Sequence, residues 1–413
     1  MEFLEHLKTY LNDEEIKKLE ASLKEESKHA LLLNEEKMKE ETLLKIYPSL
    51  KKHPIVKNAF IYDKNELDLG KSIYHELGCF YLQEPSAMVP AFLLNPSPND
   101  VVLDLCAAPG GKTMQASLLM HNQGLIIAND LSRSRSYSIS ENAERMGRGN
   151  ILVTNNDFAL IYDKFINSFD KIILDAPCSG SGMFRKENKM QEDWSIQKVS
   201  KYAGIQKELI LMCYQMLKPG GVMVYSTCSL SYEEDEEVIA HLLDNTDAEL
   251  ISVPSSPLYY VSQKGYGIHL LPFLFPGEGH YVALIHKPGQ LIRKEVNYYQ
   301  KQEKYGDYLF LLSQPYNTKY LNVIRYGVKV GQVDKNEIRY DYHYARFIKD
   351  FPSTLEIDLE TLLKYYQGET INQALMKGYI LLKYQGINVD IAKSDGRIIK
   401  NHLPKGLRKK LVA

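Results

Sequence analysis

Two cysteines occupy equivalent places in the sequence, each just after an apolar run that ends in small and polar residues. Cys178 lies in DAPCSGSG (175–182), and Cys228 lies in VYSTCSL (224–230). A cysteine can act as a nucleophile, and a second thiol beside it can help to move a proton. The other three cysteines suit simpler roles, in core packing or as a small loop residue: Cys79, Cys213 and Cys106.

A loop of small residues follows an earlier apolar run. The stretch DLCAAPGGKT (104–113) lacks the G-x-G-x-x-G of a dinucleotide site, and Cys106 stands where a phosphate-binding P-loop needs glycine. Asp130 follows the next apolar run and suits a ribose diol; Asp157 follows the third and suits an adenine amino group. Each Asp alone also suits a cap or a turn. Together they predict an adenosine ligand without a phosphate cradle, which points to S-adenosylmethionine.

A methyl donor beside two thiols has a specific chemical use. C5 of cytosine is a poor nucleophile, but a thiolate that adds to C6 makes C5 electron-rich enough to attack a methyl group. One cysteine would add, and the other would assist the later elimination; the residues alone leave open which does which. Asp175 would hold the cytosine amino group or N3. Lys112 and Lys186 are candidate cations that would favour a thiolate, although either also suits a solvated position.

These residues need a scaffold that brings them together, and the apolar pattern predicts one. Strands are expected at 100–106, 124–130, 150–157, 169–176, 221–227 and 279–287. Helices are expected at 112–120, 132–147, 195–217 and 233–243. Alternating strands and helices predict βαβ units and a mostly parallel sheet, whose ligands bind at the carboxyl ends of the strands. Cys178 and Cys228 are then expected at neighbouring strand ends, facing one cleft.

Bulk properties limit the class of protein. The 413 residues predict two or three domains, and 44% hydrophobic with 25% charged residues are typical of a globular chain. No apolar run approaches the length of a membrane span, and MEFLEHLKTYLNDEE is no signal peptide. Five cysteines without CxxC spacing argue against a disulfide framework and against a structural zinc, so we predict a cytoplasmic protein without a metal.

Five segments in order along the chain resemble one known family. They are YLQEPSAM (81–88), DLCAAPGGKT (104–113), DAPCSGSGMFRKE (175–187), YSTCSLSYEEDEEVI (225–239) and PGEGHYVALIHK (276–287). Together they resemble the RNA cytosine-C5 methyltransferases of the Sun/Fmu type. The stretch 377–408 resembles the PUA-like RNA-binding domain of the subgroup that methylates bacterial 16S ribosomal RNA. One departure concerns the N-terminal region, where LLLN (31–34) stands in place of the family's Arg-Val-Asn.

The resemblance implies an α/β fold with three parts: a small mixed α/β RNA-binding domain (1–80), a Rossmann-like S-adenosylmethionine-dependent methyltransferase domain (81–288) and a mixed α+β PUA-like RNA-binding region (289–413). It implies that Cys228 is the nucleophile, that Cys178 assists release, and that Asp175 serves the base and the cofactor. Pro177 and Lys186 complete the substrate side. The implied cofactor residues are Cys106, Ala107, Ala108, Pro109, Gly110, Gly111, Lys112, Asp130, Arg135, Asp157 and Asp175.

The RNA side rests on the last part of the chain. Lys393 to Lys410 hold seven Lys or Arg residues and one Asp, after a region with fourteen tyrosines. A solvated terminus is one interpretation, but after this tyrosine-rich region the composition fits phosphate contacts better. With the resemblance, 16S rRNA or the small ribosomal subunit is the expected partner. The alternatives are the same chemistry on tRNA and a non-catalytic RNA-binding assembly factor; DNA methylation fits less well, because the chain has no Glu-Asn-Val motif.

Overall fold

Five parallel strands form the centre of the molecule: β5 (Val101–Asp104), β6 (Leu125–Asn129), β7 (Ile151–Thr154), β8 (Phe169–Asp175) and β9 (Leu217–Thr227). Their spatial order is β9-β8-β5-β6-β7. The computed structural model describes residues 2–185, 191–262, 264–293, 301–312, 316–334, 337–373 and 376–412. The predicted Lys186 lies outside these residues. The expected parallel α/β arrangement is confirmed.

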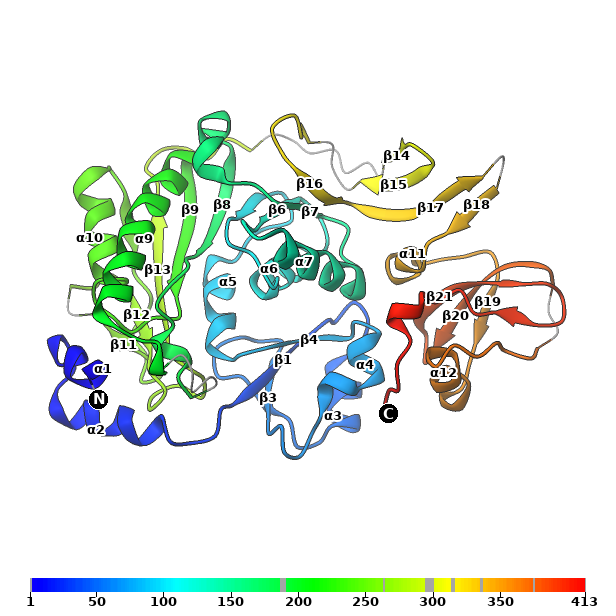
Figure 1. The fold of residues 1–413 in the computed structure, drawn as a ribbon, viewed down its shortest axis with the longest axis horizontal. Coiled ribbons are helices and arrows are strands. Elements are labelled where there is room, and N and C mark those ends of the chain that lie inside the picture. The colour runs from blue at the N-terminus through cyan, green and yellow to red at the C-terminus, as the bar shows by residue number, and fades with distance from the viewer. Residues whose placement is uncertain are drawn as a thin grey trace.

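Antiparallel strands extend this sheet at both edges (Figure 1). Beside β9 lie β13 (His280–His286), then β12 (Ile268–Leu270) and β11 (Tyr260–Val261), while β10 (Glu249–Ile251) pairs with the far end of β13. The opposite edge strand is β16 (Val323–Tyr326), which pairs with β7. The sequence predicted the strand at 279–287, but it did not predict that a strand after residue 288 would join the central sheet.

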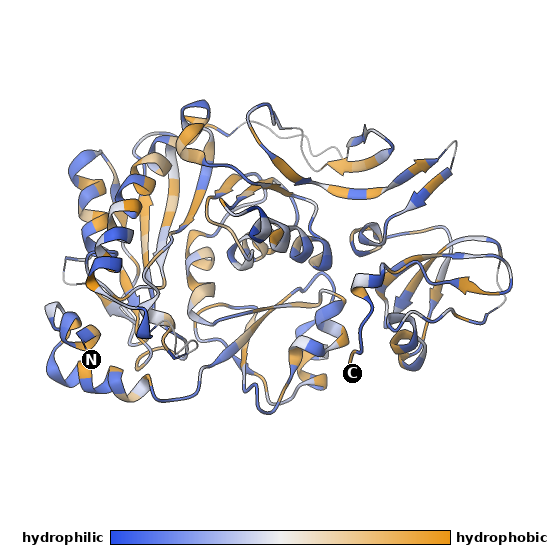
Figure 2. Cartoon of the chain, viewed as in Figure 1, coloured by the Kyte–Doolittle hydropathy of each residue, from blue (hydrophilic) through white to orange (hydrophobic). Residues whose placement is uncertain are grey.

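Helices cover both faces of the central sheet. One face carries α5 (Val89–Leu94), α6 (Gly111–Leu119) and α7 (Arg133–Met146), and the other carries α9 (Ile196–Met216) and α10 (Glu236–Asn245). Burial on both faces explains why these strands are nearly continuous apolar runs. Figure 2 shows the hydrophobic strands inside and the hydrophilic outer surface of α10. The four helices predicted for this region are confirmed to within a few residues at each end.

The first part of the chain forms a separate four-stranded sheet, in the order β2 (Lys51–Lys52), β3 (Ala59–Tyr62), β1 (His29–Leu33) and β4 (Phe80–Gln83). The helices α3 (Glu40–Ile46) and α4 (Ile73–Glu76) pack with it. Two earlier helices, α1 (Glu2–His6) and α2 (Asp13–Ser22), lie against the central region instead, where Phe3 contacts Phe184. Asn12 and Glu15 form a capping box at the start of α2.

The last part holds two four-stranded sheets. One consists of β14 (Lys301–Tyr305), β15 (Tyr308–Leu312), β17 (Val328–Asp334) and β18 (Glu337–Tyr340). The other consists of β19 (Thr354–Glu356), β20 (Gly378–Tyr384), β21 (Ile387–Ser394) and β22 (Ile399–Lys400). The helices α11 (Tyr342–Phe347) and α12 (Leu359–Tyr366) pack on these strands. None of the helices in the described parts of the chain has the length and apolarity of a membrane span.

The first and last parts share one hydrophobic core. Side chains of the β1–β4 sheet pack with Leu362, Tyr366 and Leu411 of the last part. Backbone hydrogen bonds also join the two parts: Ile73 N donates to Val412 O over 2.9 Å, and Val412 N donates to Lys71 O over 3.0 Å. The division at residues 80 and 288 stays a prediction, since β4 continues the first sheet to residue 83 and β16 belongs to the central sheet.

Candidate active site

The loop predicted to hold a cofactor joins β5 to α6. It turns tightly, because Gly110 N donates to Ala107 O over 2.7 Å and Gly110 adopts a left-handed backbone with φ of +108°. A Cβ on Gly111 would lie 2.9 Å from the end of the Gln83 side chain, which would have to move to admit it. Pro109 is exposed, which places the tip of the loop at the surface.

Asp130 lies directly beside this loop, after the end of β6. Its carboxylate accepts from Ala108 N at 3.3 Å and from Ser132 N at 2.9 Å. Arg135 lies 3.4 Å from the same carboxylate and also donates to Ala108 O over 2.8 Å, which ties α7 to the loop. A carboxylate offers about four lone-pair positions, so Asp130 retains capacity for two ribose hydroxyls. The donor and acceptor chemistry therefore fits an adenosine cofactor.

The other two carboxylates from the strand ends differ from the prediction in part. Asp157 is exposed, lies three residues beyond β7 and accepts from Ala159 N over 3.1 Å, which is the capping role considered as its alternative. Asp104 is buried and accepts from Thr113 Oγ1 over 2.6 Å. Burial raises the pKa of Asp104 to about 7, and the nearby charge of Asp175 adds to that rise. The hydrogen bond between Asp104 and Thr113 thus joins the end of β5 to α6, the two elements that the loop connects.

Asp175 ends β8 and sits in a strongly charged setting. Lys112 Nζ lies 2.7 Å from Asp175 Oδ2, and Ser226 Oγ donates to Asp175 Oδ1 over 2.7 Å. Burial alone would raise the pKa of the Asp175 carboxyl, but Lys112 and then His280 lower it well below its ordinary value. Lys112 had been a candidate cation for the thiols as well as a loop residue. In the structure its ammonium is the partner of this carboxylate.

The two thiols meet at neighbouring strand ends. Because β8 and β9 pair in parallel with Asp175 opposite Ser226, Cys178 and Cys228 emerge side by side, and their Sγ atoms are 2.8 Å apart. Both are free cysteines and both are partly exposed. Contact with Cys228, followed by burial, raises the pKa of the Cys178 thiol well above its ordinary value. Cys178 therefore holds its proton more firmly than an isolated cysteine would.

Sequence reasoning missed two residues of this site. His280, at the start of β13, places Nε2 3.6 Å from Asp175 Oδ1. Glu234 lies behind both thiol loops and bonds to each of them. His280 belonged to a segment that had been matched only as a strand, and Glu234 to the acidic run EEDEE, which suits a solvated helix start. Pro177, predicted on the substrate side, is exposed at the mouth between the strands.

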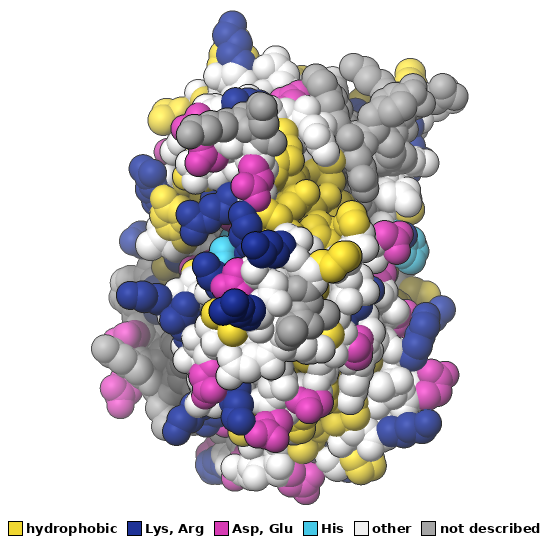
Figure 3. Space-filling view, turned by 90° about the vertical axis from the view of Figure 1, so that its right-hand side faces the viewer, with side chains coloured by type: hydrophobic (Ala, Val, Ile, Leu, Met, Phe, Trp, Pro, Cys, Tyr) yellow, Lys and Arg dark blue, Asp and Glu magenta, His cyan; other side chains and the backbone are white. Residues whose placement is uncertain are grey.

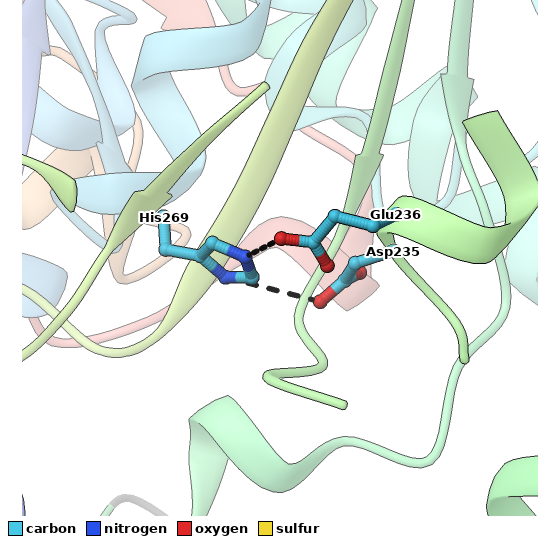
Figure 4. A group of neighbouring side chains, drawn as sticks. All are labelled: Asp235, Glu236 and His269. Carbon is cyan, nitrogen blue, oxygen red and sulfur yellow. Dashed lines mark hydrogen bonds and ion pairs between the residues drawn. The ribbon is translucent and has the colours of Figure 1, made fainter. Parts of the chain in front are cut away.

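A buried group behind Cys228 has the composition of a metal site. Asp235, Glu236 and His269 place ligand atoms within 4.8 Å of one another (Figure 4). However, His269 Nε2 is 2.7 Å from Glu236 Oε1, and Thr227 Oγ1 donates to Asp235 Oδ1 over 2.6 Å. Burial and then the charge of Glu236 raise the pKa of Asp235 well above its ordinary value. These contacts explain part of the arrangement, while Asp235 Oδ2, Glu236 Oε2 and His269 Nδ1 are buried without a hydrogen-bond partner among the described residues.

Comparisons with known proteins give a consistent result along the chain. The profile of "16S rRNA methyltransferase RsmB/F" matches residues 91–286. The profile of the "N-terminal domain of 16S rRNA methyltransferase RsmF" matches residues 1–85, and that of the "Methyltransferase RsmF PUA domain" matches residues 352–409. The three profiles follow the order of the three parts proposed from the sequence.

Two curated relatives cover most of the chain. Ribosomal RNA small subunit methyltransferase F of Vibrio vulnificus strain YJ016 is 33% identical over 389 residues, which cover 84% of this chain and 82% of the relative. The protein of the same name from Vibrio cholerae strain M66-2 is 29% identical over 402 residues, which cover 86% and 85%.

Two solved structures share the fold. A methyltransferase homolog protein from Pyrococcus horikoshii has a TM-score of 0.59 and 29% identity, and covers 68% of this chain and 93% of its own. NSun6 from Pyrococcus horikoshii, solved with SFG, has a TM-score of 0.63 and 23% identity, and covers 70% and 98%.

Proposed function

The chain belongs to the RsmB/F family of 16S rRNA methyltransferases, and we propose that it transfers a methyl group to C5 of a cytosine in 16S rRNA through an adduct on Cys228. S-adenosylmethionine is the cofactor of this methyltransferase, and when bound it supplies an electrophilic methyl group. The site residues below act on the cytosine and hold the cofactor in reach of it.

The loop and its neighbours would hold the cofactor. The small residues from Cys106 to Gly111 let the backbone approach the ligand, and Asp130 would accept hydrogen bonds from the ribose hydroxyls. Arg135 fixes the loop through Ala108 O. Asp157 is the candidate for the adenine side, with the oxygen that does not cap Ala159.

Asp175 would hold the target base. A carboxylate that stays ionised can accept a hydrogen bond from the cytosine amino group, and it would hold the base in one orientation. Lys112 and Ser226 hold this carboxylate in one orientation. Because C5 and C6 must be approached from a ring face, the cytosine has to leave its stack in the RNA.

Cys228 would add as a thiolate to C6, which shifts electron density to C5 and allows C5 to take the methyl group. A base then removes the proton from C5, the C6–sulfur bond breaks, and Cys228 returns as a thiolate. We assign Cys178 to this release step, since its sulfur lies beside the leaving sulfur. Both cysteines must be reduced rather than joined in a disulfide, a condition that a reducing compartment would supply.

One observation carries the proposal: the 2.8 Å separation of two free, partly exposed sulfurs beside an ionised carboxylate. A buried structural cysteine pair would not need Asp175 and Lys112 at its side. An assembly factor without catalysis would not need two accessible thiols at the strand ends.

A basic surface on the last part of the chain is the candidate RNA-binding face. Lys377, Lys393 and Lys400 line a groove of about 410 Å³. Lys393 Nζ lies 5.0 Å from the centre of the Tyr379 ring. Burial lowers the pKa of His402, and the positive charges of Arg339, Lys393 and Lys400 lower it further. Figure 3 shows Lys and Arg side chains gathered on this side of the molecule. Such a surface suits phosphate contacts with aromatic stacking nearby.

The direct test is transfer of a labelled methyl group from S-adenosylmethionine to separate pools of 16S rRNA, small ribosomal subunits and tRNA, followed by mapping of 5-methylcytosine. We expect label in 16S rRNA or the subunit at cytosine C5. Label in tRNA alone would contradict the substrate, and no transfer to any pool would contradict the activity.

A further inference from the structure

Glu234 is a buried carboxylate placed between the two thiol loops. It precedes α10 and is fully buried. Its Oε2 accepts from Ser179 N at 2.8 Å and from Gln206 Nε2 at 3.0 Å, and its Oε1 accepts from Ser229 Oγ at 2.8 Å. Burial is the main reason that the pKa of Glu234 is raised.

The partners of Glu234 are the immediate neighbours of the two reactive sulfurs. Ser179 follows Cys178 and Ser229 follows Cys228, so a single carboxylate spans both loops. Gln206, from α9, also donates to Pro177 O over 2.8 Å. It therefore holds the Cys178 loop at the residue before the cysteine. Further bonds tie the same loops together, including Gly182 N to Cys228 O at 2.8 Å.

This arrangement is costly for the fold. A buried carboxylate loses its hydration. The hydrogen bonds that replace it at the Glu234 side chain come from a backbone N–H, a hydroxyl and a carboxamide. A neutral or apolar side chain that fills the same space would often serve stability as well. What it would not supply is one rigid acceptor group, bonded at the same time to the loops of Cys178 and Cys228.

We propose that Glu234 is a positioning residue of the methyl-transfer reaction, which sets the separation of the Cys178 and Cys228 sulfurs. This inference rests on the proposed function, because it requires that both thiols take part in the reaction. Glu234 touches neither the base nor the cofactor in this account. Its negative charge also lies near Cys178, where it adds to contact with Cys228 and to burial in raising the pKa of that thiol.

The test compares Glu234→Gln with Glu237→Gln. Glu237 lies three residues on, in α10, and its carboxylate pairs with Lys207 at 3.2 Å on the outer surface. We expect Glu234→Gln to slow single-turnover methyl transfer by about 10- to 100-fold, because displaced reacting groups lose rate steeply. The Kd for S-adenosylmethionine and the KM for RNA should change less than about threefold. Glu237→Gln should match the wild type.

A second variant covers the case in which Glu234→Gln does not fold. Ser229→Ala removes the hydroxyl bond to Oε1, together with longer contacts to the Ser179 and Ser181 hydroxyls and to Ser231 N. We expect it to fold and to lower kcat by about 3- to 10-fold at nearly constant KM. Wild-type kcat in a folded Glu234→Gln, or in Ser229→Ala where the former does not fold, would overturn the inference. So would a loss confined to KM. Failure of the proposed function looks different, since the wild type would then transfer no methyl group.

Discussion

At the residue scale, the chemistry depends on charges that are fixed before the substrate arrives. Lys112, Ser226 and His280 converge on Asp175 and keep its carboxyl ionised far below neutral pH. A carboxyl with a lowered pKa contributes stability above its unfolded pKa of about 4, and that contribution is lost as the pH falls through the folded value. At neutral pH Asp175 is therefore a preorganised acceptor that also supports the fold.

Replacing Asp175 by Asn tests whether this carboxylate serves the base. The change keeps the size but removes the charge, so we expect kcat to fall by about 10²- to 10³-fold, as when one preorganised group is lost from an active site. Cofactor affinity should change by much less. Kinetics and calorimetric titration with S-adenosylmethionine measure the two effects, and equal losses in both would place Asp175 on the cofactor instead.

At this scale the sequence predicts the residues that we propose to react, but not Glu234, which holds their loops. Cys178, Cys228 and Asp175 could be found because each follows an apolar run that must be a strand of one sheet. Glu234 could not, because its neighbours in sequence, Glu233 and Asp235, make the run look like a solvated helix start. Its role depends on Ser179 and Gln206, which are 55 and 28 residues away along the chain.

At the scale of the elements, the active site depends on how closely three loops pack. Gly182, in the loop after β8, lies against the turn before β13 and the loop after β9. A Cβ on Gly182 would lie 2.3 Å from Gly279 O and 2.8 Å from Cys228 O. These are backbone atoms, so the added carbon could be accommodated only by moving the Gly182 loop itself, the turn at Gly279 or the loop that carries Cys228.

Gly182→Ala should therefore disturb the site, and Gly204→Ala is its matched control. Gly204 lies within α9, and a Cβ there would meet nothing within 4 Å. We expect Gly182→Ala to lower Tm and to slow single-turnover methyl transfer by at least about tenfold, because the reacting groups are displaced. Gly204→Ala should raise the stability by up to about 1 kcal/mol, as alanine favours a helix. Equal behaviour of the two variants would mean that the loop is not constrained.

Most elements of the central region could be predicted from the sequence, and the reason is their burial. A strand covered on both faces, such as β6, reads as a nearly unbroken apolar run, and the intervening helices show their own spacing. The strand β16 escaped prediction because it has four residues, an irregular register with β7 and an arginine, Arg325, in its middle. Its place in the sheet is decided by tertiary contacts, not by local pattern.

At the scale of the whole molecule, the last part of the chain is fixed to the first and presents its basic groove outward. The shared core and the backbone bonds around Val412 hold it in place. The groove of Lys377, Lys393 and Lys400 would then hold RNA at a set position relative to the thiols. Net charge is −2 for the whole chain, so this positive surface is local.

Combined replacement of Lys393 and Lys400 by Ala tests this surface. We expect weaker RNA binding and a shallower dependence of affinity on salt, with cofactor affinity unchanged, because phosphate contacts release counterions. Lys201→Ala with Lys207→Ala, on the outer helix α9, is the matched control of equal charge. Filter binding across a salt series measures both, and identical slopes for the two double variants would show that RNA does not use the groove.

The most direct measurement concerns the covalent adduct between RNA and protein. Cys178→Ala and Cys228→Ala are each incubated with S-adenosylmethionine and the RNA substrate, and the mixture is resolved under denaturing conditions. Cys178→Ala should give a slowly migrating band that contains RNA and protein, because the adduct forms and is not released. Cys228→Ala should give no such band. A band with Cys228→Ala, and none with Cys178→Ala, would contradict the assignment of Cys228 as the nucleophile.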